Sequence, residues 1–444
     1  MSEHRPESRA AEPDHQVVFR DPERFGVRVQ GGRLHLEEVE LAGLADRYDT
    51  PLYVYSEGHV LAQLRGLTAA LAGRRSRVCY AVKANPCQAI LRALAGAGAG
   101  ADIVSGGELA RARAAGFDPR VIVFSGVGKR DEEIDAAIAA QVRAIHVESH
   151  EEIEQVAARA RAAGARASVA LRVNPDIDPV THPYLATGLR ETKFGVPMAE
   201  AMTALRRIRA LPELALVGLA CHIGSQIADA APFLASLGRM REVVAALAAE
   251  GARLDYLDLG GGLGIPYAGE EATVDVAAFG RALVAGMAGL DLELVLEPGR
   301  YLVGNAGVLL TRVVGRKVSG GRTFVIVDAG MNDLIRPALY DAYHAIVPCA
   351  APAAGAAAAI ADVVGPVCEC GDFFARGRPL AVPARGEVLA ILGAGAYGMS
   401  MASTYNSRPL AAEVLVRGGA HALIRPRLDV AALIAEERPA PWQG

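Results

Sequence analysis

The feature that most constrains the fold is an alternation of short apolar runs and helical stretches from about residue 50 to 300. The stretches between the runs, such as EEIEQVAARARAAG, have helical composition and period. Strands that alternate with helices form parallel sheets. The sequence predicts strands at residues 79–83, 101–105, 121–125, 144–149, 168–174, 214–224, 256–262 and 292–299.

Eight such units over roughly 250 residues have the size and count of a (β/α)8 barrel. The competing α/β architecture is a doubly wound open sheet, whose first turn carries the pattern G-x-G-x-x-G. The first turn of this chain lacks that pattern. The barrel is therefore the preferred prediction.

After residue 305 the pattern changes to short strand-like runs separated by Gly and Pro turns, which is typical of an all-β domain. Residues 17–46 also look β-rich, so we assign them to the same domain, which is then discontinuous in sequence. The Ala-rich segment 350–362 is expected to be a loop or a short helix. The predicted organisation is a disordered tail at 1–16, N-terminal strands of the β domain at 17–46, the barrel at 47–305 and the C-terminal β domain at 306–444.

Composition excludes several classes of partner. A net charge of −4 gives no basic surface for nucleic acid or an anionic membrane, and no apolar run is long enough to span a bilayer. The first sixteen residues are polar and do not read as a signal peptide. Six cysteines without disulfide-like spacing fit a reducing cytoplasm. Cys368 and Cys370 lack a second ligand pair at zinc spacing, so we expect no metal site.

The run CYAVKANP (79–86) places a lysine, Lys83, at the end of the first apolar strand. A lysine in that position needs water, a partner or a covalent role. It could be a surface side chain that extends into solvent just beyond the strand. It could also be a desolvated amine that forms a Schiff base.

In a (β/α)8 barrel the active site lies at the carboxyl ends of the strands. There the glycines 260–262 follow the seventh expected strand, in the region where such barrels often bind phosphate. The glycines could equally make plain turns. Together with Lys83 they suggest pyridoxal 5′-phosphate, with Ser225 as a further phosphate ligand. His222 either stacks on the cofactor ring or is an ordinary polar residue with satisfied hydrogen bonds.

Glu297 follows the eighth expected strand in the sequence EPGR. A carboxylate that faces the pyridine nitrogen keeps it protonated, which makes the cofactor a strong electron acceptor and suits decarboxylation. The alternative is an ion pair between Glu297 and Arg300.

Longer motifs along nearly the whole chain carry a family resemblance. In order they are PLYVYS, YAVKANP, VSGGE, NPDIDPVTHPYLATG, TKFG, HIGSQ, GGGLGIPY, EPGRYLV, RPALYDAYH, GPVCECGD and GAYGMSMASTYNSRP. By these motifs the chain resembles the PLP-dependent decarboxylases of the alanine-racemase-like barrel type (fold type III). Within that family it is most similar to the enzymes that decarboxylate meso-2,6-diaminopimelate to L-lysine and carbon dioxide, the last step of lysine biosynthesis.

The resemblance implies roles for residues at matching positions. The implied cofactor ligands are Lys83 as the Schiff-base lysine, His222 stacked on the ring, Ser225 with Gly260, Gly261 and Gly262 around the phosphate, Glu297 at the pyridine nitrogen, and Tyr397 from the β domain.

For the substrate, the resemblance implies that Arg300, Arg336 and Tyr340 hold the distal carboxylate and that Glu369 binds the distal amine, with Tyr397 also in contact. Cys368 is implied to protonate the carbanion. In the family, the residues that match Cys368 and Glu369 enter the site from the neighbouring subunit, so the resemblance implies a homodimer with shared active sites. The alternative for Cys368 is a buried small hydrophobic residue.

Two departures from the family pattern are Cys370, where a serine is usual, and Leu410, where an arginine is usual. Neither is at the implied Schiff base or distal clamp. Three alternative functions stay open: an ornithine-, lysine- or arginine-type decarboxylase, a decarboxylase of specialised biosynthesis, and a non-catalytic PLP-binding regulatory paralogue. The first would leave an Arg336–Tyr340 clamp without purpose, because those substrates lack a distal carboxylate.

Overall fold

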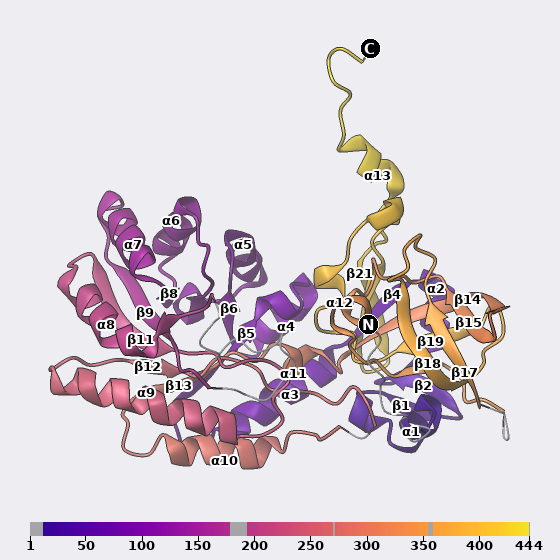
Figure 1. Cartoon of the computed structure of the whole chain (residues 1–444), viewed down its shortest axis with the longest axis horizontal. Helices are drawn as coiled ribbons and strands as arrows, with labels where there is room; N and C mark the ends of the chain where they lie inside the picture. Colours follow the sequence, from indigo (N-terminus) through magenta and orange to yellow (C-terminus); the bar gives the residue numbers. More distant parts are fainter. Residues whose placement is uncertain (1–11, 178–192, 270, 354–357, 444) are drawn as a thin grey trace. The chain divides into compact units, whose positions relative to one another are not determined.

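The computed structural model describes residues 12–177, 193–269, 271–353 and 358–443. It divides into two compact units (Figure 1). The barrel unit comprises the described parts of His59–Ile265 and Ala272–Val303. The β unit comprises the described parts of Met1–Gly58, Pro266–Glu271 and Gly304–Gly444. The first eleven residues of the expected N-terminal tail lie outside the described residues.

Eight parallel strands close into a barrel, which confirms the predicted fold class. They pair in the order β5-β6-β7-β8-β9-β11-β12-β13, and β13 pairs back onto β5. A short strand, β10 (Val196–Pro197), pairs with the last two residues of β9. The barrel strands are β5 (Ser76–Ala81), β6 (Gly100–Ile103), β7 (Ile122–Phe124), β8 (Ala144–Val147), β9 (Ala167–Asn174), β11 (Leu214–Ala220), β12 (Tyr256–Asp258) and β13 (Glu293–Leu296).

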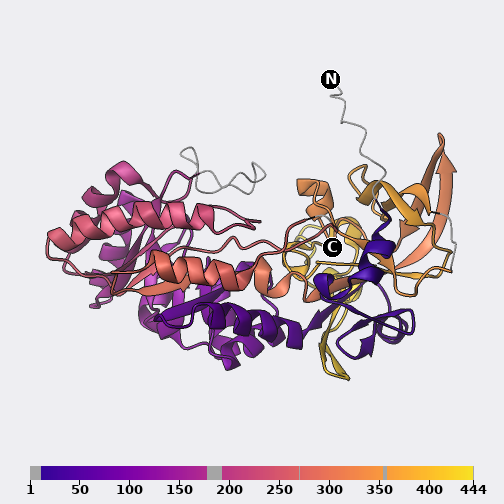
Figure 2. The ribbon, with the colours of Figure 1, turned by 90° about the horizontal axis from the view of Figure 1, so that it is seen from below.

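Helices surround these strands, as the two views of the unit show (Figures 1 and 2). Side-chain caps fix where two of them begin: Ser105 accepts a hydrogen bond from the Glu108 N–H, and Ser149 accepts one from the Glu152 N–H. The helices are α3 (Glu57–Ala70), α4 (Gln88–Gly96), α5 (Gly106–Ala115), α6 (Asp131–Ala140), α7 (His150–Ala162), α8 (Ala201–Ala210), α9 (Ala231–Ala249), α10 (Val276–Gly286) and α11 (Arg300–Val303).

The β unit contains a three-stranded sheet, β1-β2-β3, and a sheet in the order β18-β17-β15-β14-β4-β20-β21, in which β19 pairs with β14 and β16. Its helices are α1 (Asp14–Arg20), α2 (Leu41–Tyr48), α12 (Arg336–Tyr340) and α13 (Val430–Ala435). Its strands are β1 (Arg28–Gln30), β2 (Arg33–Leu36), β3 (Val39–Glu40), β4 (Leu52–Ser56), β14 (Gly307–Ser319), β15 (Arg322–Val327), β16 (Ile346–Pro348), β17 (Ala358–Val364), β18 (Phe373–Ala381), β19 (Val388–Ile391), β20 (Ala412–Arg417) and β21 (Ala420–Arg425).

The amino-terminal part of the β unit differs from the sequence-based expectation. Residues 14–16, expected in a disordered tail, and residues 17–20, expected to be β-rich, form helix α1. The carboxylate of Asp14 holds this helix in place, because it accepts hydrogen bonds from Arg378 Nη1 at 2.7 Å and from the Ile346 N–H at 2.9 Å. Such long-range contacts cannot be inferred from local composition.

Two other expectations need correction. Strand β4 was expected within the barrel domain but pairs with β14 and β20 in the β unit. The end of the Ala-rich segment is not a loop or helix: residues 358–362 belong to β17, which pairs with β15 and β18. Pairing within a sheet here overrides the helical preference of alanine. The described part of the β unit contains four α-helices besides its strands, so this unit is mostly rather than entirely β.

No helix among the described residues has the length and hydropathy needed to cross a lipid bilayer.

Candidate active site

The barrel places Lys83 at the carboxyl end of its first strand. The strand β5 ends at Ala81, and Lys83 follows in a short 3-10 turn, Val82–Ala84. Its Nζ lies 3.2 Å from Oδ2 of Asp102, at a neighbouring strand. The Asp102 side chain is fully buried, whereas 41% of the Lys83 side chain is exposed. Lys83 is thus neither a freely extended surface lysine nor a buried one.

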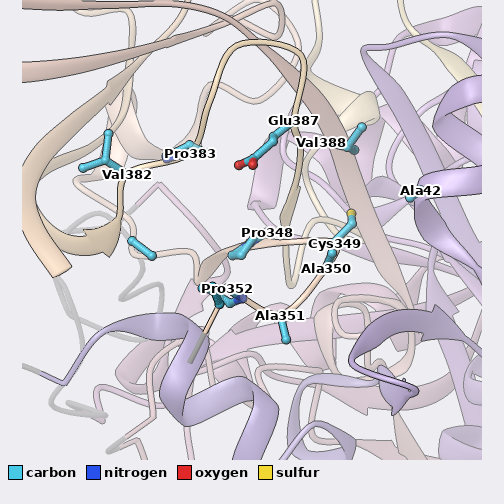
Figure 3. A pocket seen from close by; sticks show the side chains of 12 residues that line it. Ala42, Pro348, Cys349, Ala350, Ala351, Pro352, Val382, Pro383, Glu387 and Val388 are labelled. Carbon is cyan, nitrogen blue, oxygen red and sulfur yellow. The ribbon is translucent and has the colours of Figure 1, made fainter. Parts of the chain in front are cut away.

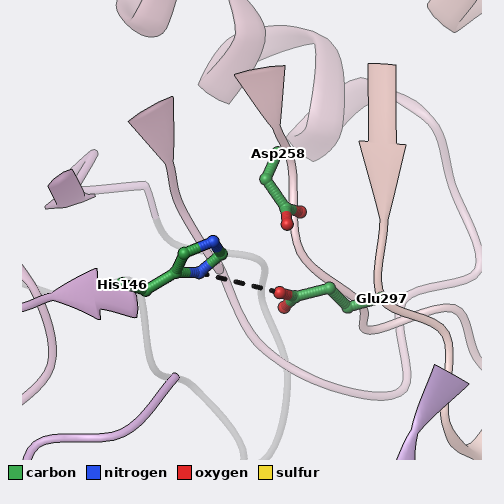
Figure 4. Close-up of side chains that lie close together, drawn as sticks. All are labelled: His146, Asp258 and Glu297. Atoms are coloured by element: carbon green, nitrogen blue, oxygen red, sulfur yellow. Dashed lines mark ion pairs between the residues drawn. The ribbon is translucent and has the colours of Figure 1, made fainter. Parts of the chain in front are cut away.

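A cluster of three buried side chains lies inside the barrel: His146 on β8, Asp258 on β12 and Glu297 after β13 (Figure 4). One ligand atom from each lies within 4.8 Å of the other two. His146 Nδ1 is 3.9 Å from Glu297 Oε1, which is too long for a hydrogen bond. Glu297 makes no ion pair with Arg300 in the described part of the chain, so that alternative from the sequence is wrong.

The environment disfavours charge on this cluster. Burial raises the pKa of the Glu297 carboxyl well above its usual range, and the negative charges of Asp102 and Asp258 add to the effect. Burial also raises the pKa of Asp258 to about 6. A cation or an N–H donor placed next to Glu297 would restore its ionised form.

The glycines 260–262 form the second part of the site. A Cβ on Gly261 would lie 2.1 Å from the carbonyl oxygen of Glu297, and Gly262 has φ +110°, so only glycine fits this path. The Gly261 N–H donates to His222 Nδ1 at 3.0 Å. Desolvation, with the positive charges of Arg172 and Lys83, lowers the pKa of His222 well below its usual value, so its ring is neutral.

Two more expected residues lie in the same unit. Arg300 is buried at the start of α11, and its Nη2 donates to Ser225 Oγ at 3.2 Å. Other polar residues near the strand ends have local structural roles instead. Ser105 caps α5, and the Glu148 carboxylate binds Arg172 at 2.9 Å and the Gly126 N–H at 2.7 Å.

These residues fit pyridoxal 5′-phosphate. Oε1 of Glu297 is buried and has no hydrogen-bond partner among the described residues, so it could accept from a protonated ring nitrogen. The glycine segment presents backbone rather than side chains, as phosphate binding requires. Lys83 supplies the amine.

The β unit carries the residues expected to bind the far end of the substrate. Arg336 is buried at the start of α12, with its guanidinium 4.6 Å from the ring centroid of Tyr267. His344 Nδ1 lies 2.8 Å from the carbonyl of Leu392, to which it donates, so its Nε2 accepts from Arg336 Nη1 at 2.9 Å. Tyr340, at the end of α12, is half-buried.

The segment between β17 and β18 places Cys368, Glu369 and Cys370 at the surface of this chain. The alternative of a buried hydrophobic cysteine is therefore wrong for Cys368. Its backbone N–H donates to Asn406 Oδ1 at 2.9 Å, which fixes the segment. Tyr397 has φ +56°, a left-handed conformation that is strained for a bulky residue and is often found at functional sites.

A pocket of about 320 Å³ lies elsewhere in the β unit (Figure 3). Its lining is mostly apolar, with Pro348, Cys349, Val382 and Val388 among the labelled residues. Its lining includes none of the expected site residues and one carboxylate, that of Glu387. We therefore do not assign the active site to this pocket.

Sequence reasoning did not identify Asp102, His146 and Asp258 as site residues. Each is an ionisable side chain inside an otherwise apolar strand. That pattern could have identified them, because burial of an ionisable group is costly unless it has a partner. The expectation considered only residues at strand ends, such as Ser105, Glu148 and Gly260, and these three lie two or three residues earlier.

Comparisons with known proteins agree with this geometry. Residues 57–304 match the family model described as "Pyridoxal-dependent decarboxylase, pyridoxal binding domain". A diaminopimelate decarboxylase of Zymomonas mobilis is 46% identical over 418 residues, which cover 93% of this chain and 99% of that protein.

Solved structures give the same result. A diaminopimelate decarboxylase from M. jannaschii in complex with L-lysine has a TM-score of 0.89 and 38% identity, covering 94% of this chain and 98% of that one. The Helicobacter pylori enzyme, also with L-lysine, has a TM-score of 0.85 and 39% identity, covering 89% and 98%.

Proposed function

The chain belongs to the pyridoxal-dependent decarboxylases and, among them, to the diaminopimelate decarboxylases, and we propose how its own residues carry out that reaction. The reaction is the pyridoxal phosphate-dependent decarboxylation of diaminopimelate to lysine. The observation that carries the proposed site is the group formed by Lys83, Asp102 and the unpartnered oxygen of Glu297 at the strand ends of one barrel.

When bound, pyridoxal 5′-phosphate accepts the electron pair left on the α-carbon when carbon dioxide departs. Lys83 holds the cofactor covalently, and Asp102 orients the lysine amine. Glu297 would accept from the ring nitrogen and so keep it protonated. The neutral ring of His222, which accepts a hydrogen bond from the Gly261 N–H, would pack on the cofactor ring next to the phosphate-binding segment.

The segment Gly260–Gly262 would hold the phosphate: the N–H groups of Gly260 and Gly261 donate to Asp258 Oδ1 and His222 Nδ1, which fixes the segment, and Gly262 would offer its N–H to the phosphate. Ser225, with Arg300 beside it, would add a hydroxyl and a positive charge. Tyr397 contributes from the β unit. The strained backbone at Tyr397 supports a functional role there.

At the far end of the substrate, Arg300, Arg336 and Tyr340 bind the distal carboxylate, and Glu369 accepts from the distal amine. The guanidinium of the buried Arg336 lies over the Tyr267 ring and donates to His344, and these two contacts orient it. This favours diaminopimelate over ornithine, lysine or arginine as the decarboxylated substrate, because none of those has a second amino-acid end.

Cys368 would supply the proton that takes the place of the departing carboxylate on the α-carbon, and the active sites would be shared within a homodimer. The support is that Cys368 and Glu369 are both exposed in the single chain, whereas a proton donor to a carbanion works in a site closed to water. A second copy that covers this segment would provide that closure. All six cysteines are free, which supports a reducing cytoplasmic location.

The shared site is tested by mixing two inactive variants, Lys83→Ala and Cys368→Ala, under conditions that exchange subunits. Each mixed dimer then has one intact site, so about a quarter of all sites should recover by pairing statistics. The matched control mixes Lys83→Ala with Glu297→Gln, which both lie in the barrel unit and should restore nothing. No recovery in the first mixture, with subunit exchange demonstrated, would overturn the shared site.

The substrate is tested with purified protein reconstituted with pyridoxal phosphate. Diaminopimelate should yield lysine and carbon dioxide in equal amounts, while ornithine, lysine and arginine should yield no product above background. Turnover of one of these three at a comparable rate would favour the alternative decarboxylases, and no turnover of any would favour the regulatory paralogue.

A further inference from the structure

His146 is a buried histidine that none of the steps above uses. Only 1% of the residue is exposed, and it lies on β8, inside the barrel. Its Nε2 is 2.9 Å from the hydroxyl of Tyr256, and its Nδ1 is 3.2 Å from Ser125 Oγ. The same Nδ1 faces Glu297 Oε1 at 3.9 Å (Figure 4).

These contacts determine which ring nitrogen carries the proton. The Tyr256 hydroxyl has no other hydrogen-bond acceptor among the described residues, and a buried hydroxyl proton without an acceptor is costly. Tyr256 therefore donates to Nε2. The proton of the neutral imidazole then lies on Nδ1, which points toward Ser125 and Glu297.

The imidazole also stays neutral. Burial lowers the pKa of His146 well below its usual value, and the positive charges of Lys129, Arg172 and Arg143 lower it further. His146 consequently presents an N–H dipole to Glu297 without forming an ion pair that would compete for the carboxylate.

We propose that His146 is a positioning residue that acts through Glu297: its Nδ1–H favours the ionised carboxylate and holds Oε1 available for the nitrogen of the cofactor ring. Glu297 needs such support, because Asp102 and Asp258 both place negative charge near it. At 3.9 Å the Nδ1–H dipole of His146 stabilises the ionised form of Glu297 but forms no hydrogen bond with Oε1. Oε1 therefore has no hydrogen-bond partner among the described residues. The inference rests on the proposed role of Glu297.

The experiment measures binding to the apoenzyme rather than turnover. The dissociation constants of pyridoxal 5′-phosphate and of its 1-deaza analogue, in which a C–H replaces the ring nitrogen, are determined for each variant. Both ligands form the same bond to lysine and the same phosphate contacts. The ratio of the two constants therefore isolates the interaction at the ring nitrogen.

Two substitutions separate the two ring nitrogens of His146. In His146→Asn the amide nitrogen can occupy the place of Nδ1, whereas in His146→Gln it can occupy the place of Nε2. Wild type should prefer the nitrogen-containing cofactor by at least about tenfold, as a charge-assisted hydrogen bond provides. His146→Asn should retain most of this preference and His146→Gln should lose most of it. Tyr256→Phe, which frees the tautomer, should also weaken the preference.

Ser236→Ala is the matched control, since Ser236 is a buried polar side chain of the same unit whose partner is Cys221. It should leave the ratio unchanged. If Glu297→Gln keeps the wild-type ratio, the assignment of Glu297 itself is wrong. If Glu297→Gln abolishes the preference while His146→Gln and Tyr256→Phe keep it, only the role of His146 is overturned. Should His146→Gln fail to fold, the outcome for Tyr256→Phe decides in the same way.

Discussion

Nζ of Lys83 lies 3.2 Å from Oδ2 of Asp102, between two adjoining strands of the barrel. The lysine can reach solvent, whereas the carboxylate is fully buried. A buried acid that contacts a half-exposed lysine directs that amine inward, toward the strand ends where Glu297 and the glycine segment lie.

Replacing Asp102 with asparagine should lower catalytic activity without lowering the stability of the fold. We expect kcat/KM for diaminopimelate to fall by about tenfold, since one charge-assisted contact to a half-exposed lysine is lost. The free energy of unfolding of the apoprotein should not fall, because the substitution also removes repulsion with Asp258 and Glu297. Steady-state kinetics and urea unfolding measure the two effects. Activity within twofold of wild type would show that Asp102 does not orient Lys83.

The glycine segment gives a test with a close control. In Gly261→Ala the new Cβ would lie 2.1 Å from a backbone oxygen, so the chain must shift, and cofactor affinity should fall by at least about tenfold. In Gly238→Ala, inside helix α9, no atom lies within 4 Å of the new Cβ. That control should bind the cofactor normally and be more stable by about 0.5–1 kcal/mol. Equal cofactor dissociation constants for the two variants would rule out a tight phosphate-binding segment at 260–262.

The proposed contact between Arg336 and the distal carboxylate predicts a loss of affinity only for ligands that carry this carboxylate. Lysine retains the distal carboxylate, whereas 1,5-diaminopentane lacks it. Arg336→Gln should therefore weaken inhibition by lysine by roughly 2–5 kcal/mol and leave inhibition by the diamine nearly unchanged. Arg378→Gln is the control, because Arg378 is a mostly buried arginine of the same unit that pairs with Asp14. Parallel losses for both inhibitors would indicate that Arg336 only supports the fold.

The raised pKa of Asp258 has a consequence for stability. Because burial raises this pKa from 3.8 to about 6, the folded apoprotein binds more protons than the unfolded chain between these values. Its free energy of unfolding should fall as the pH rises through this window, by up to about 3 kcal/mol from this group. Urea unfolding at several pH values should show a smaller fall for Asp258→Asn. An identical pH dependence in both proteins would contradict the buried, protonated carboxyl.

Much of the fold could be predicted because the barrel strands are mostly apolar runs, which is the pattern of strands buried on both faces. Lys83 and Glu297 could be identified because a charged residue directly follows such a run. Asp102, His146 and Asp258 could not, since their proximity depends on strand register, for example the pairing of Ala81 with Asp102. Helix α1 was missed for a related reason, because distant residues anchor it through Asp14.

The central claim, that Lys83 carries the cofactor, is tested most directly by reduction with borohydride followed by peptide mapping. The chain has only four lysines, at 83, 129, 193 and 317, so the modified site can be assigned without ambiguity. Lys129 is an internal control, since it is a buried lysine whose Nζ lies 2.8 Å from Oε1 of Glu152. We expect a single reduced adduct, on the peptide that contains residues 79–86, and none in Lys83→Ala. An adduct on any other lysine, or none at Lys83 in a protein that retains the cofactor, would contradict the account.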